Sequence, residues 1–212
     1  MIKYLCVFVV LIFSLSSYAV SNFIHLGHNM VGGTLTFDGV ESESVPGASI
    51  DTKISYASQI SFGYEYFDAA VNNWGKAIGF SYQGNSKEKE IENTVNLNNT
   101  STTTTSKPSD PDSISVFRLY YNWVYRFEQF YIPLGLNLTL LSFDSDNNNY
   151  DSGSGAGLNF GFGWILGERS QIEFVGYGST AELTMTQEDG SETRFGSGIY
   201  AEWIARFKLG LF

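Results

Sequence analysis

The stretch VFRLYYNWVYRF, residues 116–127, alternates large apolar or aromatic side chains with a second set that includes two arginines. Because successive side chains of a β-strand point to opposite faces, this alternation predicts a strand with two unlike faces. One face carries Phe117, Leu119, Tyr121, Trp123, Tyr125 and Phe127, and the other carries Val116, Arg118, Tyr120, Asn122, Val124 and Arg126. The fold must therefore shield the first face from water and provide partners for the two arginines.

Similar alternating segments recur along the chain, separated by stretches rich in turn-forming residues. They predict eight strands, at about 24–37, 54–67, 76–84, 114–127, 131–142, 155–167, 171–185 and 194–211. The connections are alternately short and long, and the long polar ones fall near 38–53, 84–113, 143–154 and 186–193. Two all-β architectures fit this pattern, a soluble sandwich of two sheets and a closed barrel that crosses a membrane.

The sorting of the connections favours the barrel, because short turns at one end and long loops at the other are typical of membrane barrels. The charge is sorted in the same way. The whole chain has 22 Asp and Glu against 12 Lys and Arg, and fifteen of the acidic residues and four of the lysines lie in 38–53, 84–113, 143–154 and 187–193. The excess negative charge is thus predicted to be solvated at one end of the molecule.

The strand predicted at 155–167 also favours a barrel. Gly157, Gly161 and Gly163 alternate with large apolar residues, and a glycine-rich face suits a narrow barrel interior better than the solvent face of a sandwich. The apolar faces are then predicted to contact lipid. The predicted lipid-facing residues are Phe117, Leu119, Tyr121, Trp123, Leu134, Leu136, Leu138, Phe160, Phe162, Trp164, Trp203 and Phe207.

This organisation resembles that of the small eight-stranded outer-membrane β-barrel proteins of the OmpA/OmpX type. The terminal segment ARFKLGLF ends in Phe212, similar to the terminal aromatic of that family, although Arg206, Lys208 and Gly210 occupy the register that is usually apolar. The resemblance implies an all-β, eight-stranded antiparallel up-and-down transmembrane β-barrel in a Gram-negative outer membrane. Its implied partners are outer-membrane lipid and lipopolysaccharide.

Residues 1–19 are predicted to be a cleaved signal peptide, and 20–212 the barrel domain. Lys3 precedes the short apolar run of residues 4–13, and Ser17-Tyr18-Ala19 forms a small-x-small cleavage site. A short membrane anchor is the alternative. Cys6 is the only cysteine of the chain, so the mature protein is predicted to contain no disulfide.

The inward faces are predicted to form a lumen charge network, because an eight-stranded barrel is just wide enough for side chains and enclosed charges must be paired. The predicted members are Glu65, Arg118, Arg126, Glu173, Glu202 and Arg206, accompanied by Gln59, Tyr120, Asn122, Asn137 and Asn159. On this interpretation the arginines meet glutamates and plug the barrel. A narrow conduction path through the same residues, or side chains that reach out to either mouth, are the alternatives.

Catalytic residues, a cofactor, a metal and nucleic-acid binding are not predicted. His25 and His28 have opposite parity, or one precedes the strand, and both are expected near the short-turn end in structural or solvent-exposed roles. DSDNNNYD, residues 144–151, departs from the calcium-loop pattern and is interpreted as a solvated polar loop. Glu182 falls on an outward face, which predicts a bulge or an early strand end there.

The function predicted is a structural or surface-interaction role, with a plugged polar lumen and acidic extracellular loops that are candidate sites for an extracellular ligand. A small passive pore is the second hypothesis and a lipid-modifying barrel enzyme the third. The low-complexity segment 93–113 is expected to be a mobile loop, either an adhesive tip or a tolerated insertion.

Overall fold

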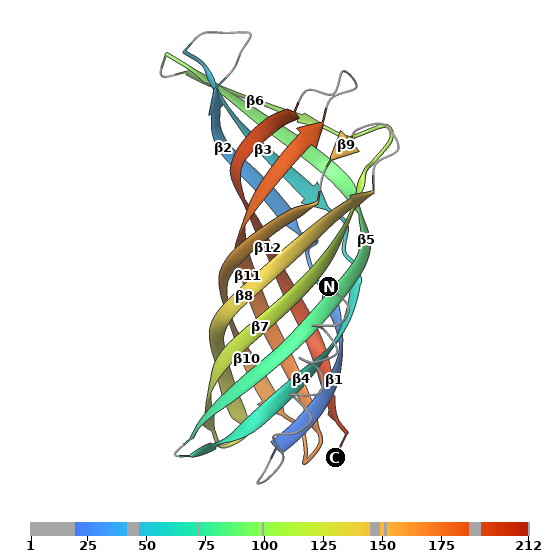
Figure 1. Ribbon diagram of the computed structural model, residues 1–212, viewed down its shortest axis with the longest axis vertical. Coiled ribbons are helices and arrows are strands. Elements are labelled where there is room, and N and C mark those ends of the chain that lie inside the picture. The colour runs from blue at the N-terminus through green and yellow to red at the C-terminus, as the bar shows by residue number, and fades with distance from the viewer. Residues whose placement is uncertain are drawn as a thin grey trace.

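The computed structural model describes residues 20–41, 47–71, 73–98, 100–144, 149–150, 152–186 and 192–211. These residues form antiparallel strands wound into a tall barrel (Figure 1). The strands are β1 (Val20–Asn29), β2 (Thr34–Glu41), β3 (Ser49–Tyr56), β4 (Ile60–Val71), β5 (Trp74–Leu97), β6 (Thr100–Ser106), β7 (Ser113–Phe127), β8 (Phe130–Asp144), β9 (Asn149–Tyr150), β10 (Gly153–Ile165), β11 (Ser170–Thr186) and β12 (Glu192–Gly210). A helix of the length and apolarity needed to cross a membrane is not found among the described residues.

Eight of these strands close into a ring, in the order β1, β4, β5, β7, β8, β10, β11 and β12. The ring closes where β1 pairs with β12, from Phe23 opposite Gly210 to Asn29 opposite Ile204. Closure leaves no unpaired edge in the barrel wall. The predicted eight-stranded antiparallel barrel is therefore confirmed.

Two of the predicted strands are interrupted at neighbouring places. The first is divided into β1 and β2 by residues 30–33, and the second into β3 and β4 by residues 57–59. Gly32 has a φ of 81°, a conformation that glycine adopts at low cost. Backbone hydrogen bonds bridge the interruption, from Asn29 N to Gln59 O at 2.9 Å and from Tyr56 N to Gly33 O at 2.8 Å. The wall thus stays hydrogen-bonded where its strands bend.

The two ends of the barrel differ, as the connection lengths predict. Tight connections join β4 to β5, β7 to β8 and β10 to β11 at one end, which we call the turn end. Asn73 and Glu128 have positive φ angles of 68° and 52° in two of these turns. The opposite end, called the loop end, carries the longer connections and the outer parts of β2, β3, β5 and β6 (Figure 1).

The third strand is much longer than predicted, and the expectation of an irregular loop after residue 84 is wrong. β5 continues to Leu97 and turns into β6, while β3 pairs with β5 as far as Ser49 opposite Asn96. β2, β3, β5 and β6 together form a sheet at the loop end, which we call the loop-end sheet. Its threonines favour strands because they are branched at Cβ, and the hydroxyls of Thr94 and Thr103 lie 2.9 Å apart.

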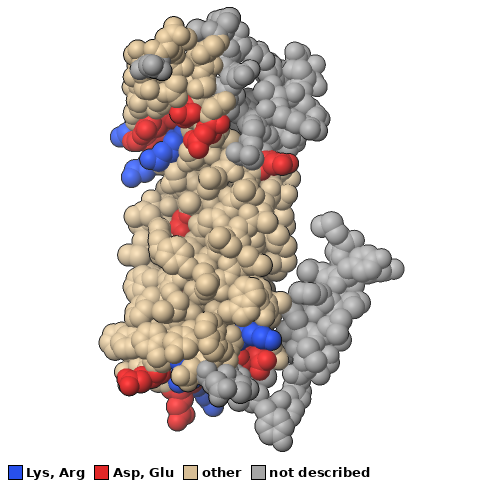
Figure 2. All heavy atoms as spheres, turned by 90° about the vertical axis from the view of Figure 1, so that its left-hand side faces the viewer, with Lys and Arg blue, Asp and Glu red and all other residues tan. Residues whose placement is uncertain are grey.

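The remaining wall follows the predicted alternation of faces. The pairing of β11 with β12 shifts register between Ala181 and Leu183, so the bulge predicted at Glu182 is confirmed. Outward side chains form a broad band with few charges, and charged residues gather toward the two ends of the visible face (Figure 2). Such a band between charged ends is the surface expected for a barrel that crosses a lipid bilayer.

Candidate functional site in the barrel lumen

Inward side chains fill the barrel in three successive layers. Near the loop end lies an apolar layer of Leu35, Phe37, Tyr56, Ile114, Val116, Leu141, Ala181 and Tyr200. Near the turn end lies a smaller apolar layer of Ala77, Val124 and Tyr131. The layer between them contains the buried charges. An eight-stranded barrel has room for side chains and little else, so each layer narrows the axial path.

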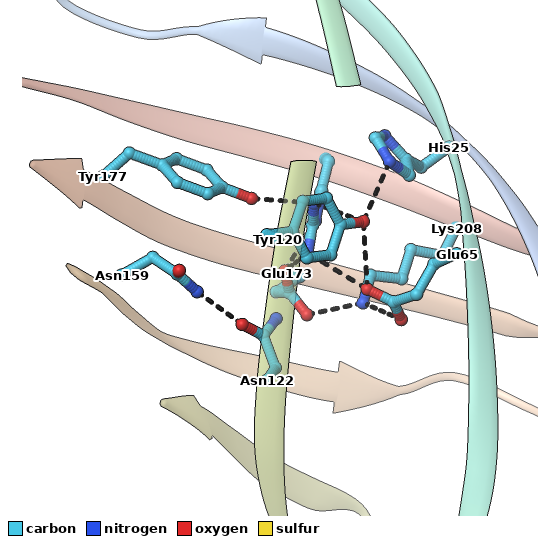
Figure 3. Close-up of polar contacts among 9 residues, drawn as sticks. His25, Glu65, Tyr120, Asn122, Asn159, Glu173, Tyr177 and Lys208 are labelled. Atoms are coloured by element: carbon cyan, nitrogen blue, oxygen red, sulfur yellow. Dashed lines mark hydrogen bonds and ion pairs between the residues drawn. The ribbon is translucent and has the colours of Figure 1, made fainter. Parts of the chain in front are cut away.

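Four charged side chains meet in the part of the middle layer toward the turn end, and Figure 3 labels three of them, Glu65, Glu173 and Lys208. We call Glu65, Glu173, Arg206 and Lys208 the lower charge cluster. Arg206 Nε donates to Glu173 Oε1 at 2.5 Å, and Lys208 Nζ lies 2.7 Å from Glu65 Oε1 and 2.6 Å from Glu173 Oε2. All four residues are at most 2 % exposed. The cluster contains two cations and two carboxylates, so its formal charges cancel.

Aromatic side chains enclose this cluster. Arg206 Nη1 donates to the hydroxyl of Tyr177 at 3.0 Å and to that of Tyr120 at 3.2 Å. Tyr120 donates in turn to Glu65 Oε2 at 3.1 Å, and its hydroxyl lies 3.3 Å from His25 Nε2 (Figure 3). These neutral groups supply hydrogen bonds to buried charges that water cannot reach.

Arg118 and Glu202 form a second ion pair nearer the loop end, and both side chains are buried. Asn29 donates to the same carboxylate, and Tyr200 donates to it at 3.3 Å. The guanidinium of Arg118 lies 4.8 Å from the ring centroid of Tyr177, which links this pair to the lower charge cluster. Since one cation faces one carboxylate here as well, the whole middle layer is neutral.

Two glycines make room for the side chains that enclose the cluster. A Cβ on Gly63 would lie 2.4 Å from His25 Cε1, and a Cβ on Gly79 would lie 2.5 Å from the Tyr120 hydroxyl. Both distances are shorter than any ordinary contact between carbon or oxygen atoms. A side chain at either position would therefore displace His25 or Tyr120 from its place in the lumen.

Five of the six residues predicted for the lumen network lie in the middle layer, and Arg126 does not. Arg126 has the inward parity of Arg118, but it is exposed at the turn end, where its Nε reaches Glu128 O at 3.5 Å. It is not in an ion pair with any described carboxylate, so the prediction that it meets a glutamate is wrong. The physical reason is its position at the end of β7, where water solvates the guanidinium.

Sequence reasoning missed Lys208. It shares the parity of Glu202 and Arg206, so the alternation of β12 contains the signal, but this position is usually apolar in the terminal strand of the resembled family. His25 and His28 lie on opposite faces as predicted by parity: His25 is 4 % exposed inside the lumen and His28 is exposed outside. Gln59 lies in the interruption of the wall, where its amide donates to Asn85 O at 3.0 Å.

The twelve residues predicted to face lipid all lie on the outward face. Ten of them are exposed, while Phe117 and Tyr121 are half-buried between neighbouring aromatic side chains. A small cavity of about 20 Å³ opens at the turn end, and it has room for about one water molecule. It is lined by Glu65, Phe67, Val124, Arg126, Tyr131, Ile165 and Gln171.

The described residues do not bring together a group of side chains suited to metal binding or catalysis. The described residues contain no group of three or more His, Cys, Asp or Glu side chains that could hold a metal ion. The candidate calcium loop at 144–151 falls largely outside the described residues. His25 contacts Tyr120 and lies 6.5 Å from it between ring centroids, but no serine, threonine or cysteine is placed against it as a nucleophile by any described hydrogen bond.

One acidic side chain outside the lipid-facing band has a shifted pKa. Glu88 lies on β5 in the loop-end sheet, where its backbone N–H donates to Asp112 O at 2.8 Å. Partial burial, together with the negative charge of Asp112, raises the pKa of the Glu88 carboxyl from 4.5 to about 7. This carboxyl therefore changes charge near neutral pH.

Comparison with solved structures gives the same architecture. The outer membrane protein AlkL, solved in lipid bilayers, is 13% identical, with a TM-score of 0.56 over 92% of this chain and 93% of that chain. Neisserial surface protein A has a TM-score of 0.49 at 10% identity (90% and 98% covered), and the attachment protein Ail of Yersinia pestis 0.46 at 11% (91% and 97% covered). No protein-family model and no curated protein sequence matches the chain. The AlkL match confirms the fold of a small outer-membrane barrel.

Proposed function

We propose that this protein is a plugged structural barrel of a Gram-negative outer membrane, with a surface-interaction role carried by its loop end. The observation that carries the proposal is the neutral, buried middle layer between two apolar layers. Arg118 with Glu202 and the lower charge cluster occupy the axis where ions would have to pass. The apolar layers and the paired charges along that path would oppose the passage of an ion.

The outward surface supports the membrane location. Leu134, Leu136 and Leu138 are each more than half exposed, although burial of such side chains is strongly favoured in water. Lipid removes this penalty, and outer-membrane lipid and lipopolysaccharide are therefore the proposed partners of the band. Residues 1–19 would act as the export signal and 20–212 as the mature barrel, and an extracellular ligand would bind the acidic loops.

Ion conductance tests the plug. The mature protein is refolded, its folding is checked by heat-modifiable mobility on a gel, and it is inserted into a planar lipid bilayer. We expect no reproducible conductance steps from the folded protein. Steps that change in size when Arg118 is replaced by methionine would overturn the plug, because they would locate the current in the middle layer.

A passive pore is the second candidate, and one observation favours it. Ser61, Ser81 and Gln83 are buried in the lumen wall, and their side-chain polar atoms have no protein partner among the described residues. Polar groups of this kind suit a hydrated path. The same conductance experiment separates the two functions, with Ser81→Val as a matched variant that would lower a current along this side of the wall.

A further inference from the structure

Among the described residues, the loop-end sheet ends in a strand, β6, that has a partner on one side alone. β6 pairs with β5, from Ser106 opposite Ile91 to Thr100 opposite Leu97, and with no other strand in the described part of the chain. All seven of its residues are exposed. Natural proteins protect such edges with charge, proline, a bulge or a covering loop, because an open edge pairs readily with another strand. The sequence TSTTTTS has no charged residue, proline or glycine.

The hairpin geometry shows which backbone groups of β6 are open. Two residues separate Leu97 from Thr100, and Asn98 has a φ of 48°, as in a two-residue hairpin turn. In such a turn the flanking residues hydrogen-bond to each other, and the direction then alternates along the strand. The N–H and C=O groups of Ser101, Thr103 and Thr105 therefore point away from β5. The close approach of the Thr94 and Thr103 hydroxyls, at 2.9 Å, fits this non-hydrogen-bonded pairing.

We propose that β6 pairs antiparallel with β6 of a second copy of this chain, centred on Thr103. The strand reads nearly the same in both directions about Thr103, so Ser101 of one copy would lie opposite Thr105 of the other. A two-fold contact needs this kind of self-complementary surface. The three outward residues of each copy would then exchange backbone hydrogen bonds with their counterparts.

Charge selects this strand among the surfaces of the loop end. The chain has a formal net charge of −10, and fifteen acidic residues lie in the loop regions, so most contacts between two loop ends would bring like charges together. β6 is uncharged along its whole length. In the proposed register Lys107 would lie opposite position 99 and not opposite another lysine. The neutral edge is therefore the part of the loop end at which two acidic copies approach with least repulsion.

The contact is expected to be weak unless the copies are concentrated. Seven residues of strand span about 23 Å, and an edge of that length buries less surface than the roughly 1,200–2,000 Å² of a stable interface. The inference therefore rests on the proposed membrane location, which orients the copies and raises their local density.

Disulfide trapping in the outer membrane tests the register. The full chain carries Cys6→Ser, so that an introduced cysteine is its only thiol, and either Thr103→Cys or Thr102→Cys. Two copies of residue 103 would place their Cα atoms about 5.5 Å apart, within disulfide range, whereas two copies of residue 102 would be about 8 Å apart. We expect at least about fivefold more covalent dimer from Thr103→Cys under mild oxidation. Equal trapping at both positions, or none at either, would overturn the proposal.

A second variant tests the backbone hydrogen bonds. Thr105→Pro removes an outward N–H without removing a bond to β5, while Thr105→Val keeps that N–H and the β-branched shape. In the Thr103→Cys background we expect proline to reduce the covalent dimer several-fold and valine to leave it unchanged. Unaltered trapping with proline would contradict strand pairing. Heat-modifiable mobility, measured on the same samples, separates a failed contact from a barrel that did not fold or insert.

Discussion

Arg206 and Arg126 both follow the inward parity of their strands, yet only Arg206 is enclosed by carboxylates. Replacing Arg206 with methionine would leave Glu65 and Glu173 with Lys208 as their sole cation. Because a buried charge that loses its partner is costly, we expect Arg206→Met to lower the free energy of unfolding by about 3–5 kcal/mol. Urea unfolding followed by tryptophan fluorescence measures this. Arg126→Met is the matched control, with an expected change below about 0.5 kcal/mol.

The pair Arg118–Glu202 allows a sharper test of the same reasoning. Arg118→Met or Glu202→Gln alone should each lower the free energy of unfolding by about 3–5 kcal/mol, since each leaves a buried group without its partner. The double variant removes both partners and should lose much less than the sum. Additive losses in the urea experiment would mean that the two side chains do not depend on each other.

Glu88 gives the loop end a pH dependence with a definite sign. Its pKa is about 7 in the folded protein and 4.5 without the fold, so the folded state holds a proton that the unfolded state has lost between these values. The contribution of Glu88 is therefore fully present below pH 4.5, declines as the pH rises toward 7 and stays lost above it. Hydrogen exchange at β5 and β7, expressed as protection factors so that the pH dependence of intrinsic amide exchange is removed, should show less protection at pH 8 than at pH 5.5. Glu88→Gln should remove this difference, and its persistence would assign it to another group.

At the scale of the elements, the period-two alternation made the eight strands of the barrel wall predictable. Lipid outside the barrel and packed side chains inside it require unlike residues on the two faces of each strand. Strand ends were harder to predict. β5 extends to Leu97 because β3 and β6 pair with it on both sides, a partnership between segments far apart in the sequence. The lower charge cluster was partly predictable from parity, whereas the exposure of Arg126 depends on how far β7 reaches toward the turn end. The tilt of the strands determines how far β7 extends toward the turn end, and the inward or outward parity of a residue gives no information about tilt.

The loop-end sheet determines which deletion the barrel should tolerate. Removing 84–113 would take away the β5 partner of β3 and the pairing of Ser86 and Lys87 with β7, so we expect it to destabilise the fold. Removing 94–103 and joining the ends with Asn-Gly shortens the hairpin of β5 and β6 and takes away only the last three pairs of β3 with β5, at residues 49–51. The shorter deletion should leave the urea midpoint within error of the parent protein. A large loss from this deletion would show that the tip stabilises the barrel itself.

At the scale of the whole molecule, the positions of charged and apolar side chains are exchanged relative to a soluble β-protein, with charges inside and apolar side chains outside. Arg118, Arg206 and Lys208, of a type that a soluble protein places in water, are at most 2 % exposed. The outward leucines of β8, Leu134, Leu136, Leu138 and Leu140, are more than half exposed. Each arrangement requires the other. A low-dielectric surround of lipid favours complete pairing of the enclosed charges, and a filled interior keeps the thin wall from collapsing.

This arrangement predicts that the cost of an outward charge depends on its depth. Leu136 lies near the middle of β8, opposite Tyr121 and Leu158, and Ser142 lies on the same face near the loop end. In phospholipid vesicles we expect Leu136→Arg to reduce the free energy of unfolding by about 2–4 kcal/mol, and Ser142→Arg by about 0–1 kcal/mol. Reversible urea unfolding in vesicles measures both. Equal costs would mean that the band does not lie in hydrocarbon, whereas the expected gradient would set the position of the bilayer along β8.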